Sequence, residues 1–467
     1  MSERPYAIPI PYRDPVEAFQ GFAGDSVSAL LDSAAKAGGR GRYAYIAADP
    51  FQIISATSDD GNPFDTLDQA LKQFRLRNDP ALPPFQGGAV GFLGYEMGRY
   101  LEALPAEKAA GLDLPDMCFG LYDTVCAFDT RTRQAWVVAC NVSDGRPGAE
   151  MRAEMRAQKM AEKIAAQPPL PDLDWTLSGV WTAELSRDVY QGMVKRALGY
   201  IHAGDIFQAN ITQRLLAELP RGLDPFMLYR RLRSLSPAPF GAYLGVGPGA
   251  AIASASPERF LSLTPDGRVT TRPIKGTRPR GQSAKEDDRL ARDLVSSEKD
   301  MAENLMIVDL LRNDLSRVCR LGSVGVSELA RLESFANVHH LVSEVHGTLF
   351  PNLGAVDLLR ATFPGGSITG APKIRAMEII NELEPARRGA YCGAVAWIGF
   401  DGAMDSSIII RTLAIKDGVV AAQAGGGIVA DSDPAAEYLE AMDKVWPLLQ
   451  SLAPEDRARK EIKEQGR

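Results

Sequence analysis

The chain contains 467 residues, of which 45% are hydrophobic and 24% are charged, and it carries a formal net charge of −7. Its length permits two or three domains with large cores. The acidic balance, without a block of lysines and arginines, argues against a nucleic-acid-binding protein. Five scattered cysteines without a Cys-x-x-Cys pair argue against a disulfide framework and a thiolate zinc site. Because no basic stretch precedes an apolar run at the N-terminus, we expect a cytoplasmic protein.

The first 170 residues are predicted to form an α+β region. Short runs with strand composition alternate with turn residues, as at residues 88–92 and 135–139. A charged segment over residues 148–167 is predicted to be a helix. It must end at the proline-rich segment that follows, because prolines remove backbone donors and favour extended neighbours. We therefore predict a domain boundary there, with a second domain over residues 178–460.

The rest of the chain mixes many strands with long helices. The predicted elements, in chain order, are a helix at 188–203, strands at 206–216, 241–246, 259–263 and 269–272, a helix at 287–318, and strands at 393–399, 406–415 and 419–424. On the long helix, apolar residues three and four positions apart form one face: Leu290, Leu294, Met301, Leu305, Val308 and Leu315. This mixture favours an α+β layered architecture over a βαβ repeat.

Two predicted helices carry carboxylates three residues apart. These are Asp300 and Glu303 on the long helix, and Glu437 and Glu440 on the last helix. Residues at this spacing project from one helix face, so each helix can present two oxygen donors to one point. Mg²⁺ is typically bound through one or two carboxylates, with water or substrate oxygens completing its shell. The pattern fits a magnesium site, and the alternative is a solvated helix face.

Two glycine-rich segments are candidate anion-binding sites. Gly425, Gly426 and Gly427 follow a predicted strand, and backbone N–H groups there can approach an anion without a Cβ in the way. A flexible turn is the alternative interpretation. The second segment, residues 363–373, lacks the Gly-Lys-Ser/Thr ending of a nucleotide P-loop, which argues against an ATP site. A helix that begins near Pro372 could still bind a carboxylate at its N-terminus.

Lys275 lies in a Pro-Ile-Lys-Gly-Thr segment at a predicted strand end, an uncommon context for lysine. Burial near another cation would lower its pKa and leave a neutral amine able to attack carbon, whereas the alternative is a surface lysine. Glu258 is a candidate general acid if burial keeps it protonated, and otherwise a strand-end ion pair with Arg259. We expect His340 to form hydrogen bonds in the pocket, and the other histidines to be structural: His202, His339 and His346.

Together these motifs closely resemble those of the chorismate-utilising enzymes. The matching segments are Gly-Asp-Ile-Phe-Gln-Ala-Asn at 204–210, Ser-Pro-Glu-Arg at 256–259, the lysine segment at 273–277, Ser-Glu-Lys-Asp at 297–300, Asp-Leu-Leu-Arg-Asn-Asp-Leu at 309–315, and the segments at 365–373 and 425–440. They lie in order within residues 186–452. The resemblance implies an α+β fold of layered antiparallel β-sheets, with a sandwich-like core flanked by helices.

Within this family, the sequence is similar to the branch that aminates chorismate at C4, the aminodeoxychorismate synthases (component I). Relatives that aminate C2, the anthranilate synthases, usually have alanine at the position of Lys275. Isochorismate and salicylate synthases usually have a lysine base at the position of Gln208. The resemblance therefore implies formation of 4-amino-4-deoxychorismate, a precursor of p-aminobenzoate and folate. The alternatives are C2 amination and a non-catalytic, ligand-binding regulator that kept the fold.

The resemblance also implies roles for individual residues. Lys275 would attack C2 of chorismate while Glu258 protonates the departing C4 hydroxyl. The ligands of Mg²⁺ would be Glu303 and Glu440, with Asp300 and Glu437 acting through waters. The residues that bind the substrate would be Gln208, Thr277, His340, Tyr391, Arg411, Gly425, Gly426 and Gly427.

Ammonia for this reaction has to come from a partner. The chain contains no cysteine in a nucleophile-elbow setting with a downstream His-x-Glu, so we expect a separate glutamine amidotransferase subunit, and another enzyme for conversion to p-aminobenzoate. In the N-terminal third, the Leu-Leu-Asp-Ser segment at 30–33 resembles a family segment that lines a tryptophan pocket. Ser33 and Tyr43 are the expected contacts. Core packing on a short helix explains these residues equally well.

Overall fold

The computed structural model describes residues 4–34, 41–56, 61–106, 108–109, 111–141, 149–334 and 338–453. The strands are β1 (Tyr6–Ile10), β2 (Val27–Asp32), β3 (Tyr43–Ala48), β4 (Gln52–Ala56), β5 (Gly88–Leu93), β6 (Met117–Tyr122), β7 (Thr124–Asp129), β8 (Gln134–Ala139), β9 (Thr182–Ala183), β10 (Gln208–Glu218), β11 (Phe240–Val246), β12 (Ala250–Ser256), β13 (Arg259–Leu263), β14 (Arg268–Thr271), β15 (Ile274–Pro279), β16 (Gly325–Ser334), β17 (Val338–Thr348), β18 (Gly370–Ala371), β19 (Ala394–Gly399), β20 (Met404–Ile408), β21 (Thr412–Lys416) and β22 (Val419–Ile428). The α-helices are α1 (Pro15–Phe19), α2 (Pro63–Lys72), α3 (Ala149–Ala165), α4 (Arg187–His202), α5 (Pro225–Leu235), α6 (Ala284–Val295), α7 (Glu298–Ser316), α8 (Ala355–Thr362), α9 (Lys373–Leu383) and α10 (Pro434–Leu452).

Within the described residues, these strands form a 12-stranded sheet and a 10-stranded sheet. The first follows the order β1-β8-β7-β3-β2-β11-β12-β21-β22-β10-β18, with β9 beside β10. The second follows the order β15-β17-β14-β13-β20-β19-β5-β6-β4, with β16 beside β17. The two large sheets, with helices around them, confirm the predicted α+β fold of layered antiparallel sheets.

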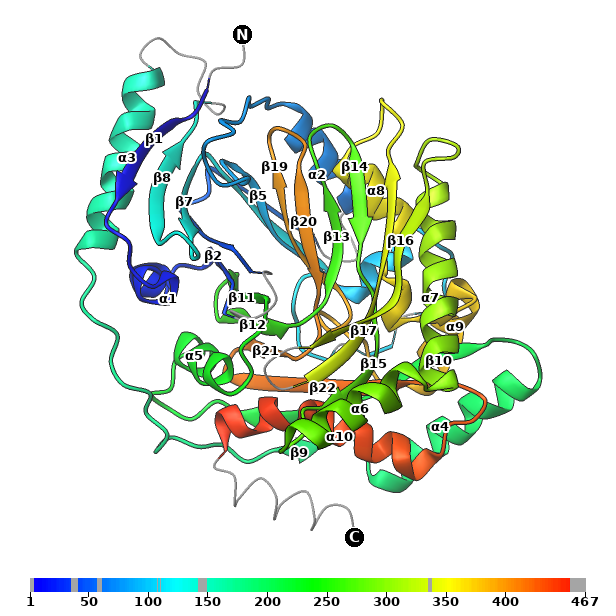
Figure 1. Ribbon diagram of the computed structural model, residues 1–467. Coiled ribbons are helices and arrows are strands. Elements are labelled where there is room, and N and C mark those ends of the chain that lie inside the picture. The colour runs from blue at the N-terminus through cyan, green and yellow to red at the C-terminus, as the bar shows by residue number, and fades with distance from the viewer. Residues whose placement is uncertain are drawn as a thin grey trace.

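The two sheets face each other, and helices cover their outer faces (Figure 1). Because successive side chains of a strand point to opposite faces, one strand serves two cores. On β3, Tyr45 lies in the core between the sheets, while Ile46 lies in the outer core beneath α3, α5 and α10. On β5, Phe92 lies between the sheets, and Leu93 packs toward α7 and α8. Among the described residues, no helix has both the length and the apolar composition that a membrane span requires.

Strands from both ends of the chain share each sheet. β2 pairs with β11, with Leu30 opposite Tyr243, and β5 pairs with β19, with Val90 opposite Trp397. The boundary predicted between the first 170 residues and residues 178–460 therefore divides the sequence but not the sheets, and it stays a prediction. One consequence is that segments far apart in sequence can line one cavity between the sheets.

The prediction of a single helix over residues 287–318 is wrong, because α6 ends and α7 begins inside it. The Ser297 side chain caps α7 by accepting the backbone N–H of Asp300. The apolar face changes phase at this break. As a result, Met301 and Leu305 are 37% and 57% exposed, although both were predicted to belong to one apolar face of the helix.

Two further local predictions are wrong. Residues 406–415 are not one strand: β20 ends in the 10-stranded sheet, and β21 begins in the 12-stranded sheet. Arg411, in the crossover, has φ of +54°, a left-handed conformation that ends the extended run. Residues 30–33 lie at the end of strand β2 and not on a helix.

Candidate active site

Strand β15 positions Lys275, which pairs with Leu341 of β17. The next residue, Gly276, has φ of +76°, a conformation that favours glycine. A Cβ at this position would lie 2.9 Å from Cδ1 of Leu294 and 3.1 Å from Cβ of Asp300. The glycine therefore lets α6 and α7 pack closely against the strand, and this brings the carboxylates of α7 next to Lys275.

The Lys275 side chain is half-buried, with its Nζ 3.5 Å from the carbonyl oxygen of Ser367. Burial lowers the pKa of Lys275 below its usual value, and the charge of Lys444 lowers it further, whereas Glu303 and Glu258 oppose the shift. A lower pKa raises the fraction of neutral amine, which is the form that attacks carbon. The predicted condition for a nucleophilic lysine was burial near a second cation, and Lys444 is that cation.

Glu258 is 6% exposed and directly precedes β13. Burial raises its pKa to about 7, while the Ser367 side chain and the charge of Lys275 oppose the shift. Arg259 forms a two-point ion pair with Asp405, at 2.9 Å for both hydrogen bonds, so the alternative of a strand-end pair between Glu258 and Arg259 is wrong. A carboxyl group with this pKa is partly protonated near neutral pH and can donate a proton.

Glu303 on α7 and Glu440 on α10 approach the site from two helices. Burial raises the pKa of Glu303, and the negative charges of Asp300 and Glu440 add to that effect. Glu437, one helical turn before Glu440, is 5% exposed and accepts a 2.6 Å hydrogen bond from the Ser432 hydroxyl. The structure thus brings all four predicted carboxylates into one neighbourhood.

These oxygen donors suit Mg²⁺, although the described residues hold no group of three ligand side chains close enough to form a complete metal site alone. Glu440 is paired with Lys444 at 2.6 Å, and Asp300 is paired with Arg278 at 2.9 Å. Mg²⁺ usually takes only one or two protein carboxylates and keeps its other positions for water and substrate oxygens. The donor set therefore fits an ion that protein and substrate bind jointly.

The glycine triplet at residues 425–427 lies within strand β22, so its interpretation as a flexible turn is wrong. One edge of the triplet pairs with β10, whereas the pairing with β21 on the other edge ends at Ala422. A Cβ on Gly426 would lie 2.7 Å from Oε2 of Glu437. The glycines therefore let α10 lie against the strand, and they leave backbone groups on the second edge available to a ligand.

Gln208, at the start of β10, is fully buried beside this strand. Its Nε2 donates to Oδ1 of Asn210 at 3.3 Å and lies directly over Gly427. Its Oε1 is buried without a hydrogen-bond partner among the described residues. Buried acceptors are normally paired, so this oxygen is suited to accept from a ligand N–H or O–H.

The remaining predicted contacts form two groups. Thr277 and His340 meet on neighbouring strands β15 and β17, with 2.8 Å between Oγ1 and Nδ1. Arg411 interacts electrostatically with Tyr391 and Glu440, and its Nη1 donates to the backbone carbonyl of Lys444 at 2.8 Å. The structure therefore gathers the residues predicted to bind the substrate around the lysine and the acidic helices.

Two groups at the site were not predicted from the sequence. Lys444 pairs with Glu440 and donates to the carbonyl oxygen of Gly425 at 3.0 Å. Its position four residues after Glu440 was a usable signal, because such residues share a helix face. Ser367, whose carbonyl accepts from Asn210 at 3.1 Å, lies in the glycine-rich segment at residues 363–373 that was singled out, but its contacts were not predicted because they are distant in sequence.

The glycine-rich segment at residues 363–373 ends in a structural lysine. Nζ of Lys373 lies 2.6 Å from Oδ2 of Asp314 and 2.8 Å from the carbonyl oxygen of Thr362. The charge of Lys373 is therefore paired with Asp314, and this ion pair links α9 to α7. Carboxylate binding at the start of α9, near Pro372, stays a prediction.

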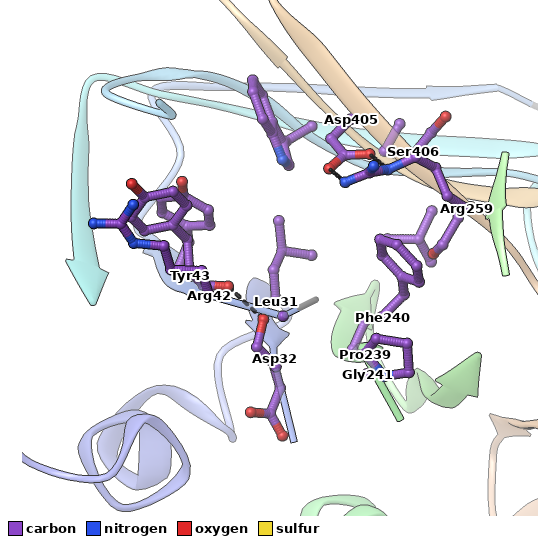
Figure 2. A pocket seen from close by; sticks show the side chains of 18 of the residues that line it. Leu31, Asp32, Arg42, Tyr43, Pro239, Phe240, Gly241, Arg259, Asp405 and Ser406 are labelled. Carbon is purple, nitrogen blue, oxygen red and sulfur yellow. Dashed lines mark hydrogen bonds and ion pairs between the residues drawn. The ribbon is translucent and has the colours of Figure 1, made fainter. Parts of the chain in front are cut away.

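A separate cavity of about 400 Å³ lies between the sheets, lined by strands of both (Figure 2). Ser33 and Tyr43 line it, and the Ser33 hydroxyl donates to the Tyr43 carbonyl at 2.5 Å. Neither Lys275 nor Glu258 belongs to its lining. Its wall is rich in further aromatic side chains: Tyr45, Phe240 and Trp397.

The family model described as "chorismate binding enzyme" matches residues 28–450. The chain is 44% identical over 402 residues to aminodeoxychorismate synthase component 1 of Klebsiella aerogenes, covering 86% of this chain and 85% of that protein. It is 41% identical over 453 residues to anthranilate synthase component 1 of Streptomyces coelicolor, covering 93% and 86%.

Among solved structures, the fold is similar to that of anthranilate synthase component I from Streptococcus pneumoniae. The TM-score is 0.79 at 35% sequence identity, over 87% of this chain and 92% of that chain. The similarities therefore extend over most of the molecule, including both sheets and the helices that carry the acidic pairs.

Proposed function

The chain belongs to the chorismate binding enzyme family, and on that premise we propose that it aminates chorismate at C4 to form 4-amino-4-deoxychorismate. The observation that carries this proposal is the environment of Lys275, a half-buried amine with a lowered pKa beside a buried carboxyl group, Glu258. A nucleophile and an acid at one site are what a substitution through a covalent intermediate requires. Relatives named aminodeoxychorismate synthase and anthranilate synthase are both similar to this chain, so we base the choice of C4 on the lysine.

In the first step, the neutral amine of Lys275 attacks C2 of the chorismate ring. Both conjugated ring double bonds shift, and the C4–O bond breaks as Glu258 delivers its proton to the departing hydroxyl. Water leaves, and the substrate is bound to Lys275 through a C2–N bond. The raised pKa of Glu258 supplies the proton near neutral pH.

In the second step, ammonia adds at C4 and both double bonds shift back. The C2–N bond to Lys275 breaks, and the amine leaves with the electron pair. Overall, one ammonia molecule enters and one water molecule leaves. The added nitrogen loses its extra proton to the Glu258 carboxylate, which restores the acid, and Lys275 is regenerated as a neutral amine. The nitrogen enters at C4 because C2 was occupied during the addition.

The substrate carboxylates have separate partners in this proposal. Glu303 and Glu440 would hold Mg²⁺ together with the ring carboxylate, with Asp300 and Glu437 acting through waters. When bound, Mg²⁺ supplies positive charge that withdraws electron density from the ring. The enolpyruvyl carboxylate would contact Arg411, Tyr391 and the backbone of residues 425–427, with Gln208, Thr277 and His340 completing the pocket.

We propose that ammonia reaches this site from a separate glutamine amidotransferase subunit. The relatives of this chain are named component 1, which implies a second component. The product would serve p-aminobenzoate and folate biosynthesis, after a lyase removes the enolpyruvyl group.

Product identity tests the proposal directly. Incubation with chorismate, ammonium and Mg²⁺ should yield 4-amino-4-deoxychorismate, identified by mass and by conversion to p-aminobenzoate with an added lyase. Chelation of the metal should stop the reaction. Fluorescent anthranilate as the sole product would assign C2 amination instead. No consumption of chorismate, even with the amidotransferase present, would assign a ligand-binding regulator.

We further propose that the cavity between the sheets binds tryptophan. The aromatic wall of the cavity suits a large flat side chain, and the Ser33 hydroxyl suits the polar groups of an amino acid. L-Tryptophan should raise the unfolding temperature, and about 100 times its Kd should stabilise the protein by about 2.7 kcal/mol. Tyr43→Ala should weaken binding by about tenfold or more. No shift at millimolar tryptophan would refute this assignment.

A further inference from the structure

Arg259 directly follows Glu258, yet the two side chains serve different sites. Successive side chains along extended backbone lie on opposite faces. Glu258 interacts with Lys275 at the reaction site, whereas Arg259 lines the cavity of about 400 Å³. There it forms its two-point pair with Asp405, drawn in Figure 2. The segment that carries the acid thus also forms part of the wall of the cavity.

The backbone at this point lacks a regular ladder. Arg259 lies opposite Ser407 of β20, but the register between β13 and β20 shifts before Ser262. Across the irregularity, the Ser406 hydroxyl accepts from the backbone N–H of Leu261 at 3.1 Å and donates to its carbonyl at 3.0 Å. Side-chain hydrogen bonds therefore replace backbone hydrogen bonds that the irregular register does not form.

The Arg259–Asp405 pair is the second side-chain link across this irregularity. Two parallel charge-assisted hydrogen bonds fix the guanidinium more firmly than one contact would. The Phe240 ring lies below it, 5.2 Å from the guanidinium carbon. At Glu258 itself, the backbone carbonyl accepts a hydrogen bond from the backbone N–H of Ile408 on β20 at 3.1 Å. The direction of the Glu258 side chain thus depends on links to β20 at Glu258 itself and at Arg259.

We propose that the Arg259–Asp405 ion pair is a positioning element that holds Glu258 within reach of the C4 hydroxyl that it protonates. The inference rests on the proposed function, in which Glu258 is the acid. Proton transfer needs the donor within hydrogen-bond reach of its target, and a misplacement of about 1 Å can cost about 10²-fold in rate. The pair lies at the wall of the separate cavity, whose lining does not include Lys275, so its effect on the reaction must pass through Glu258.

A double-mutant cycle on the full chain tests this, with chorismate, ammonium and Mg²⁺ as substrates. Arg259→Lys keeps the charge but loses the two-point contact. We expect kcat to fall about tenfold or more with KM for chorismate unchanged, and the alkaline limb of the pH–rate profile to move. In a Glu258→Gln background, Arg259→Lys should cost nothing further, because the acid it positions is gone. Asp405→Asn should behave in the same way.

Arg360→Lys is the matched control, because the Arg360 guanidinium also pairs with an aspartate, Asp65 at 2.6 Å, and lies over an aromatic ring, that of Phe64 at 5.6 Å. Arg360 lies on α8 and does not line the cavity, and its replacement should leave kcat and the pH profile as in wild type. Asp405→Glu retains both charges and should recover part of the rate that Asp405→Asn loses. The unfolding temperature of each variant is measured in parallel.

Two results would overturn the inference. One is an Arg259→Lys variant with wild-type kcat and pH profile, and the other is an equal loss with and without Glu258, which would show a structural role only. The two proposals fail separately. Full activity of Glu258→Gln alone would remove the acid from the proposed function. An impaired Glu258→Gln beside fully active Arg259 and Asp405 variants would overturn only the positioning role.

Discussion

Replacing Lys275 by alanine should abolish covalent capture of the substrate and lower the rate of C4 amination by about 10³-fold, equivalent to about 4 kcal/mol of activation free energy. The reason is that C2 would no longer be occupied when ammonia arrives. The C4 hydroxyl would also no longer be displaced by the attack of Lys275 on C2. Any remaining product should shift toward amination at C2. Rates and products are measured together, by chromatography of reactions with chorismate, ammonium and Mg²⁺.

Mass spectrometry of the wild-type protein after brief exposure to chorismate without ammonia supplies the direct evidence. The peptide that contains Lys275 should gain the mass of chorismate less one water. Lys416→Ala is a suitable control, because Lys416 lies on β21 beside the Pro248 carbonyl, at 3.1 Å, and takes no part in the Lys275 site. An unchanged rate and product spectrum in Lys275→Ala would remove the lysine from the mechanism.

The acidic pairs could be predicted because their signal is local. Residues three apart share a helix face, and this places Asp300 with Glu303, and Glu437 with Glu440, whatever the fold does. Which helices then meet is a tertiary question. The structure answers it with the glycines of β22, on which α10 packs so closely that a Cβ on Gly426 would lie 2.7 Å from Glu437.

The ion-pair partners could not be predicted in the same way. Arg259 follows Glu258 in the chain and pairs with Asp405, which is 146 residues away. The antiparallel pairing of β13 with β20 creates that contact, and no local sequence pattern around Arg259 or Asp405 predicts it. The break at Ser297 was missed for a different reason, because a serine pair inside a periodic apolar pattern can be either a cap or a surface position.

The tryptophan-pocket residues show a third case. Ser33 and Tyr43 could be singled out by resemblance, but the cavity that they line needs strands from both ends of the chain. Phe240 and Trp397 reach it through the pairing of β11 with β2 and of β19 with β5. Sequence patterns place residues on strand faces, whereas cavities depend on which faces oppose each other.

Glu258→Gln should lower kcat by about 10²–10⁴-fold, the range that positioned general acids contribute. Glutamine preserves the size and hydrogen-bonding reach of the side chain but has no proton to deliver. Wild-type activity should fall as pH rises above about 7, since burial raises the pKa of Glu258 to about 7 and the required form is the protonated one. The variant should lack this alkaline limb, and full activity in it would reject the acid role.

Loss of folding can be separated from loss of the acid, because the pH dependence of stability runs in a known direction. The pKa of Glu258 is about 7 in the folded protein against 4.5 for the free side chain, so the folded state binds the proton more tightly. Its contribution to stability is therefore lost as pH rises from about 4.5 to about 7. Above that range wild type buries a charged carboxylate and the variant does not.

Glu258→Gln should consequently unfold at the same or a higher temperature than wild type at pH 8, while its kcat is lower. Glu96→Gln is the matched control: Glu96 is buried, its pKa is also raised to about 7 by burial, and it accepts backbone N–H groups of Arg388 and Gly389 at 2.9 Å, outside the Lys275 site. It should retain the alkaline limb of activity. A limb lost equally in both variants would mean that the limb reports burial of a carboxyl group in general, and not the proton that Glu258 gives to the C4 hydroxyl.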